Sequence, residues 1–176
     1  NRITRVGHSP LRFDSCRNMV VRANCFYNEW GRNYELVASG RLLVEDNIIT
    51  EAFDSSHSAD TRAKNAYIDS IFRFNRVFGN SHTPLDSPSY FPMVGSENGF
   101  CREPFRLVNS RIYHNTITEN LGLGWQLWGI SIAANRFKNN CFHRNDYAGG
   151  GTQIEFRDVT SRDNLVHCNL LHGAEP

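Results

Sequence analysis

The densest run of polar side chains, residues 54–64, reads Asp-Ser-Ser-His-Ser-Ala-Asp-Thr-Arg-Ala-Lys. Its Asp54, His57 and Asp60 are residue types that act as general acids and bases or bind a metal ion, and Arg62 follows them in the same run. The same composition is typical of a solvated loop. Both interpretations stay open at this point, because the partners that orient a metal ligand are not visible in a sequence.

Histidine and cysteine, the usual ligands of zinc, do not occur at the spacings of a zinc site. The seven His residues are scattered, and the five Cys residues form no Cys-x-x-Cys pair. We expect Cys25 and Cys141 to be buried thiols. The alternative is one or two disulfides, and the odd number of Cys then leaves at least one thiol unpaired within this chain. We expect His114 to lie beside Asp46 or Phe74 of an adjacent coil. The sequence therefore predicts no metal site and no cofactor.

Composition narrows the class of protein. The chain has 176 residues, a formal net charge of +1 and 40% hydrophobic residues, which fits a single domain over residues 1–176. So small a net charge argues against nucleic-acid binding. No apolar run approaches the roughly 18 residues that a membrane helix needs. The chain is rich in Asn, with 19, and has 17 Arg against two Lys.

The elements that position these residues follow a repeat of Asn, any residue, and then Ile, Val or Phe. We assign seven of its occurrences to successive coils, spaced by 23, 23, 28, 40, 20 and 29 residues: Asn1, Asn24, Asn47, Asn75, Asn115, Asn135 and Asn164. Apolar and polar residues alternate before the asparagines, as in half-buried strands. A short strand, an Asn turn and a second strand describe one coil of a parallel β-helix, whose stacked coils share a core.

Stacked coils would place equivalent residues in rows. The predicted ladder of turn amides holds Asn24, Asn47, Asn75, Asn115 and Asn164. Two predicted inner rows hold Val21, Val44, Phe72, Ile112 and Ile132, and Phe26, Ile49, Val77, Ile117, Phe137 and Val166. An outward row would hold Arg22, Glu45, Arg73, Tyr113 and Arg162. This outward row either pairs its unlike charges or grips a glycan with Arg and Tyr.

This pattern resembles, over nearly the whole chain, the right-handed parallel β-helix superfamily, which includes pectate-lyase-like and NosD-like repeat proteins. The resemblance implies an all-β, right-handed parallel β-helix solenoid with about seven coils, one for each repeat asparagine. Members include polysaccharide lyases, hydrolases and adhesins, so the fold alone selects no function. The motifs of polygalacturonase-like hydrolases are absent, since Asn115-Thr116-Ile117 lacks their acid. Calcium is expected only if the chain belongs to a lyase.

Two insertions interrupt the regular coils, at residues 54–69 and 80–105. The second contains four prolines, which block strand pairing. Insertions in a solenoid often gather on its binding face. The predicted binding residues therefore lie in these insertions or beside them: Asp54, His57, Asp60, Arg62, Arg73, His82, Asp86, Glu103 and Arg106.

The sequence favours an extracellular or cell-surface module, an excerpt of a longer chain, that acts as a structural or adhesive rod. Its expected partners are a polysaccharide or glycan, neighbouring copies and other extracellular proteins. The alternative is a section of a polysaccharide lyase or glycoside hydrolase, because a catalytic carboxylate pair can come from distant coils. An open groove with a converging acid, base and Arg would distinguish the enzyme from the rod.

Overall fold

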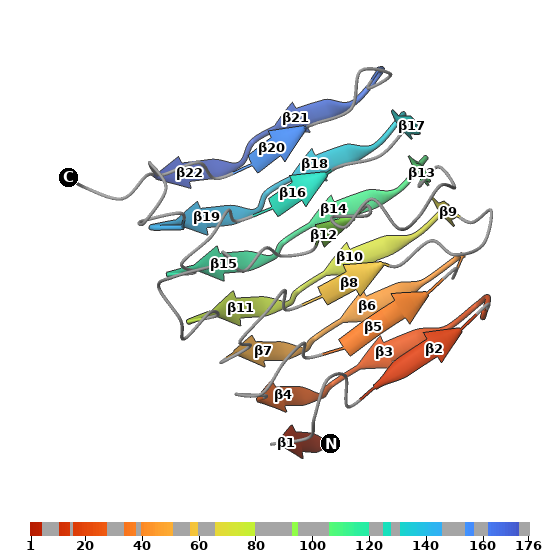
Figure 1. The fold of residues 1–176 in the computed structure, drawn as a ribbon. Coiled ribbons are helices and arrows are strands. Elements are labelled where there is room, and N and C mark those ends of the chain that lie inside the picture. Colours follow the sequence, from red (N-terminus) through yellow and green to blue (C-terminus); the bar gives the residue numbers. More distant parts are fainter. Residues whose placement is uncertain are drawn as a thin grey trace, which may run out of the picture.

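The computed structural model describes residues 1–4, 11–14, 16–27, 34–37, 40–50, 57–59, 66–79, 93–94, 106–119, 125–127, 131–145, 154–156 and 162–172. Over these residues the chain is all-β, and its short strands pair in parallel (Figure 1). Neighbouring strands of each sheet come from successive passes of the chain, so the passes lie on one another. This arrangement confirms the predicted stack of parallel strands and fits a parallel β-helix-like solenoid.

Two sheets make up the most regular part of the stack. Sheet I consists, in spatial order, of β1 (Arg2–Thr4), β4 (Cys25–Tyr27), β7 (Ile48–Thr50), β11 (Arg76–Phe78), β15 (Thr116–Thr118), β19 (Cys141–His143) and β22 (Leu170–His172). Sheet II consists of β3 (Val20–Arg22), β6 (Leu43–Glu45), β10 (Ile71–Arg73), β14 (Arg111–Tyr113), β18 (Arg136–Lys138) and β21 (Leu165–His167). Each strand of sheet II is followed after two residues by a strand of sheet I.

Two further sheets occur among the described residues. Sheet III consists of β2 (Arg12–Asp14), β5 (Tyr34–Val37), β8 (His57–Ala59), β12 (Met93–Val94), β16 (Trp125–Leu127) and β20 (Ile154–Phe156). Sheet IV consists of β9 (Ala66–Ile68), β13 (Arg106–Val108) and β17 (Ser131–Ala133). The segment 54–69 thus contains β8 and β9, and the segment 80–105 contains β12. Most other residues of both segments lie outside the described ranges.

The corners between strands share one backbone conformation. Fourteen non-glycine residues of the described ranges have φ between 51 and 56°, in the left-handed region. That conformation costs roughly 1–2 kcal/mol for an L-residue. Hydrogen bonds between coils offset the cost, since the backbone N–H of Ala23 donates to the Glu45 carbonyl, and that of Asp46 to the Arg73 carbonyl, both at 3.3 Å.

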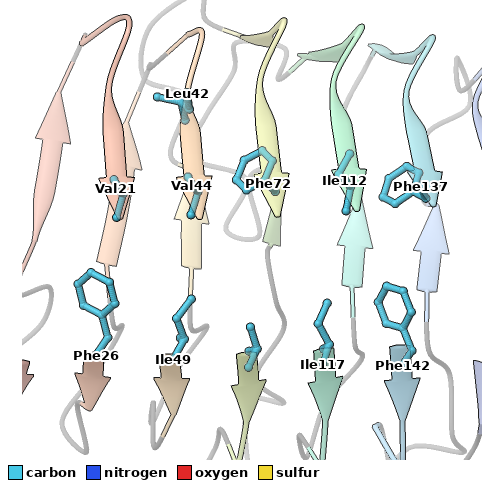
Figure 2. Packing of buried hydrophobic residues seen from close by; sticks show 11 residues of the cluster. Val21, Phe26, Leu42, Val44, Ile49, Phe72, Ile112, Ile117, Phe137 and Phe142 are labelled. Atoms are coloured by element: carbon cyan, nitrogen blue, oxygen red, sulfur yellow. The ribbon is translucent and has the colours of Figure 1, made fainter. Parts of the chain in front are cut away.

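Among the described residues, the core is one cluster formed mainly by the central residues of strands in sheets I and II (Figure 2). The inner row of sheet II contains Val21, Val44, Phe72, Ile112, Phe137 and Val166, and that of sheet I contains Ile3, Phe26, Ile49, Val77, Ile117, Phe142 and Leu171. Phe137 and Val166 thus belong to the row of sheet II, not to that of sheet I as predicted. The predicted Ile132 lies in β17 of sheet IV.

A ladder of asparagine amides joins successive coils at the corner between sheets II and I. Asn47 is 1% exposed and satisfied at every position of its amide. Its Oδ1 accepts from the N–H and Nδ2 of Asn24, and its Nδ2 donates to the Val21 carbonyl and to Asn75 Oδ1. The complete ladder holds Asn1, Asn24, Asn47, Asn75, Asn115, Asn140 and Asn169.

The predicted ladder residue Asn164 lies in a second row, at the corner between sheets IV and II. There its Oδ1 accepts from the N–H and Nδ2 of Asn135. Serines take the same position earlier in the chain, because the Ser70 N–H donates to Ser110 Oγ and the Ser110 N–H to Asn135 Oδ1. Asn135 and Asn164 matched the sequence repeat because this row uses the same corner chemistry as the first.

Candidate functional site

The outward row of sheet II brings charged, polar and aromatic side chains into contact with one another. The third residues of its strands are in register and read Arg22, Glu45, Arg73, Tyr113, Lys138 and His167. The first four confirm the predicted outward row. The fifth predicted member, Arg162, instead forms an isolated parallel β-bridge with Ala133, beside sheet IV. The prediction placed Arg162 on sheet II because it assigned Asn164 to the corner between sheets II and I, whereas Asn164 lies at the preceding corner, between sheets IV and II.

Glu45 lies between two arginines of this row. Its side chain is only 3% exposed, against 54% for Arg22 and 32% for Arg73. The Arg22 Nε donates to Glu45 Oε1, and the Arg73 Nε donates to Glu45 Oε2 at 2.5 Å. Burial alone would raise the pKa of Glu45, but the hydrogen bonds and charges of Arg73 and Arg22 outweigh it and lower the pKa. Glu45 is therefore an anion that holds both guanidinium groups in place.

Arg73 is fixed from a second side by aromatic rings. Its Nη1 donates to Tyr113 Oη at 2.8 Å. Its guanidinium carbon lies 5.5 Å from the ring centre of Phe74 and 5.8 Å from that of Tyr113, within the range of cation–π attraction. Hydrogen bonds to Tyr113 and Glu45 raise the pKa of Arg73 above its ordinary value. Contacts within the chain therefore keep the Arg73 guanidinium charged and hold it in one orientation.

Three rings form what we call the aromatic corner, which consists of Phe74, Tyr113 and His114. The Phe74 and His114 rings stack at 5.3 Å with an angle of 17°, and Tyr113 meets His114 edge-on at 5.4 Å. Phe74 is 46% exposed and has a φ of 56°. A large apolar side chain gains little stability when it is exposed at a left-handed position, where Asn or Gly would fit better. Phe74 therefore presents an apolar ring to solvent beside the Arg73 guanidinium.

Cationic side chains outnumber acidic ones on the strands of sheet II. The strands of sheet II carry Glu45 as an acidic side chain against five cationic ones: Arg22, Arg73, Arg111, Arg136 and Lys138. Arg111 and Arg136 are register partners at the exposed first positions of β14 and β18. Because parallel strands lie about 4.8 Å apart, this face presents closely spaced guanidinium groups beside apolar rings.

The predicted binding residues are distributed over several parts of the fold. Arg73 lies in the outward row of sheet II, beside Glu45 and Tyr113. His57 begins β8 in sheet III, in register with Tyr34, and Arg106 begins β13 in sheet IV, in register with Ala66 and Ser131. The remaining six lie outside the described residues: Asp54, Asp60, Arg62, His82, Asp86 and Glu103.

Sequence reasoning placed His114 beside Asp46 or Phe74, and the His114 ring stacks on that of Phe74. It did not predict the exposed position of Phe74. The available signal was its position directly before a ladder asparagine, where the chain must turn. The thiols also differ from expectation, because Cys25 and Cys141 are half-buried. Each is the first residue of a strand in sheet I, and first positions face outward rather than into the core.

Within the described ranges, no three His, Cys, Asp or Glu side chains come together as ligands of a metal ion. The described residues also include no helix long and apolar enough to cross a membrane. Comparisons of the chain with protein-family models, with curated proteins and with solved structures gave no match. The candidate site therefore rests on its own geometry.

Proposed function

We propose that the chain is a section of a right-handed parallel β-helix of about seven coils, related to the pectate-lyase-like superfamily, that acts outside the cell or at its surface as a structural or adhesive rod. Its ligand is an anionic polysaccharide bound along the outward face of sheet II. Neighbouring copies and other extracellular proteins are its further partners. The observation that carries this proposal is the exposed, stacked pair of Phe74 and His114 beside the preset Arg73.

The chemistry of this face suits acidic sugars. A guanidinium group binds a carboxylate or sulfate through two parallel hydrogen bonds, and Arg fits such groups better than Lys does. Exposed rings offer apolar faces on which the C–H face of a sugar ring can pack. Arg111 and Arg136, which are exposed neighbours in register, extend the cationic face along the stack. A repeating polymer can therefore contact several coils at once, so weak individual contacts add up.

The test is a binding titration against uronic-acid, sulfated and neutral polysaccharides at low and high salt. The anionic polymers should bind, and binding should weaken as salt screens the charges. Replacing Phe74 and His114 by Asn, which tolerates the left-handed corner, should weaken binding about tenfold, or about 1.4 kcal/mol. The pair of changes Arg111→Gln and Arg136→Gln should weaken binding of the anionic polymers in particular.

Sheet I offers matched controls, because it presents an exposed Phe and an exposed Arg on a different face. Phe78→Thr and Arg76→Gln, both on β11, should leave binding unchanged. The proposal fails if these controls weaken binding as much as the variants of sheet II do, or if no polymer binds the wild-type chain.

The same polymers separate the rod from the alternative, a section of a polysaccharide lyase or glycoside hydrolase. A lyase would produce unsaturated ends that absorb ultraviolet light, with Ca²⁺ added for this assay, and a hydrolase would produce new reducing ends. Product formation that persists after purification would show that the chain is a section of an enzyme and not a non-catalytic rod.

A further inference from the structure

A pair of histidines on the outward face of sheet I carries an inference independent of glycan binding. His143 ends β19 and His172 ends β22, and the two residues are register partners on adjacent parallel strands. Their ring centres are 4.9 Å apart, and the ring planes make an angle of 42°. Phe142 and Leu171, the residues before them, are inner-row partners, so both imidazoles leave the sheet on its outer side.

The backbone that carries this pair is fixed at both strand ends. The His143 carbonyl accepts from the N–H of Glu119 at 3.0 Å, and the His172 carbonyl accepts from the N–H of Arg144 at 2.9 Å. Ligands on paired strands are held more accurately than ligands on loops. His143 is half-buried and His172 is exposed, so the pair is reachable from solvent.

We propose that His143 and His172 bind one divalent transition-metal ion, with water completing its coordination. A nitrogen–metal bond is about 2.0–2.1 Å long, so two neighbouring imidazoles can share an ion after small rotations about their side-chain bonds. Imidazole suits Cu²⁺, Ni²⁺ and Zn²⁺, whereas Ca²⁺ and Mg²⁺ prefer oxygen ligands. Thr118 precedes His143 in the same outward row, and the exposed Glu119 and Arg144 at the adjoining corners contribute opposite charges.

The ion would tie β22 to the rest of sheet I. β22 is the last strand in the order of this sheet, and its Leu170 and Leu171 are 63% and 52% exposed. Among the described strands, β22 pairs with β19. An ion that binds both histidines of the folded chain more tightly than those of the unfolded chain stabilises the folded state.

The experiment uses the full chain after treatment with a chelator and titrates it separately with Cu²⁺, Ni²⁺, Zn²⁺ and Ca²⁺ by calorimetry. We expect Cu²⁺ to bind more tightly than Ni²⁺ or Zn²⁺, and Ca²⁺ not to bind at this pair. His172→Gln should weaken Cu²⁺ and Zn²⁺ binding by at least about 10-fold, the loss typical of disturbing even an indirect metal partner. Zn²⁺ should raise the melting temperature of the wild-type chain and not that of His172→Gln.

His167→Gln is the matched control, because His167 ends β21 as His172 ends β22 but has Lys138 as its register partner. This variant should keep the wild-type affinity for each metal and the wild-type thermal shift. His143→Gln should repeat the effect of His172→Gln, and the exposed His172 carries the test if the His143 variant does not fold. The proposal is overturned if His172→Gln binds metal as the wild type does, or if His167→Gln loses as much affinity.

Discussion

Glu45 is a buried carboxylate whose charge is balanced by two arginines that reach solvent. Removing one partner of a buried ion pair is costly, because the remaining charge is left without compensation. The cost is smaller here than for a fully enclosed pair, since Arg22 and Arg73 are 54% and 32% exposed and water screens them. The same carboxylate orients Arg73 toward Tyr113 and Phe74, so stability and the candidate site depend on one residue.

The lowered pKa of Glu45 predicts a defined dependence of stability on pH. A carboxylate whose folded-state pKa lies below its unfolded-state pKa adds stability above the unfolded value, near 4.3, and loses it as pH falls through the folded value. Glu45→Gln should therefore lower the free energy of unfolding by about 1–3 kcal/mol at pH 7. The gap between variant and wild type should shrink below about pH 4.

Urea unfolding of both proteins over a pH series measures this gap, and Glu119→Gln, which removes an exposed carboxylate at a corner, is the control. A gap that stays constant from pH 7 to pH 3 would show that the ionised form of Glu45 adds nothing.

At the scale of the element, the unit of this fold is a three-residue strand, a left-handed corner residue and a polar residue that bonds to the next coil. The segment from Val20 to Asn24 shows all of its parts. The strand supplies one inward side chain, the corner turns the chain, and the asparagine amide satisfies backbone groups that the turn leaves without strand partners. Stacking repeats each of these bonds from coil to coil.

Asn47→Ala tests how much one rung of the ladder contributes. The change leaves the buried Val21 carbonyl and the Asn24 N–H without their side-chain partner. It should lower the free energy of unfolding by at least about 1–3 kcal/mol. Asn169→Ala, at a half-buried rung, should cost less, and Thr116→Ala on an exposed strand position should cost least. Equal losses for Asn47→Ala and Thr116→Ala, measured by thermal or urea unfolding, would contradict this role for the ladder.

The sequence pattern predicted the element well, because alternation and the turn asparagine are local properties. It did not predict correctly, for every strand, which sheet the strand belongs to. After Asn115 the signature occurs at both Asn135 and Asn140, five residues apart, and Asn164 is followed five residues later by Asn169, whose apolar residue is Leu171. Only the pairing between strands decides which asparagine joins which ladder. Phe74 was missed for another reason, since its exposure follows from the corner conformation rather than from any periodicity.

At the scale of the whole molecule, stability should vary along the stack. Phe72 and Ile117, in the middle, are 1% and 0% exposed, whereas Val166 and Leu171, in the same inner rows, are 42% and 52% exposed. Each coil of a solenoid is stabilised mainly by its neighbours. The segments 54–69 and 80–105 contain none of the seven repeat asparagines, so the sequence pattern did not predict that β8, β9 and β12 pair within sheets III and IV.

Hydrogen–deuterium exchange should reveal this gradient. Backbone amides of β10, β11, β14 and β15 should exchange most slowly, and those of β21 and β22 should exchange faster, because local opening there exposes less additional apolar surface. Peptide-resolved mass spectrometry measures both groups in one experiment. Uniform protection from β10 to β22 would indicate that the stack unfolds as a single cooperative unit.

The direction of the asparagine ladder has an electrostatic consequence. Every side-chain carbonyl in it points back toward the preceding coil, and one Nδ2–H points toward the following coil, as in the series from Asn24 through Asn47 and Asn75 to Asn115. The amide dipoles therefore add along the stack, as peptide dipoles add along a helix. Their sum makes the ladder's contribution to the potential more positive toward β22 and more negative toward β1, so the stack of strands has a polarity that is independent of its ionised side chains.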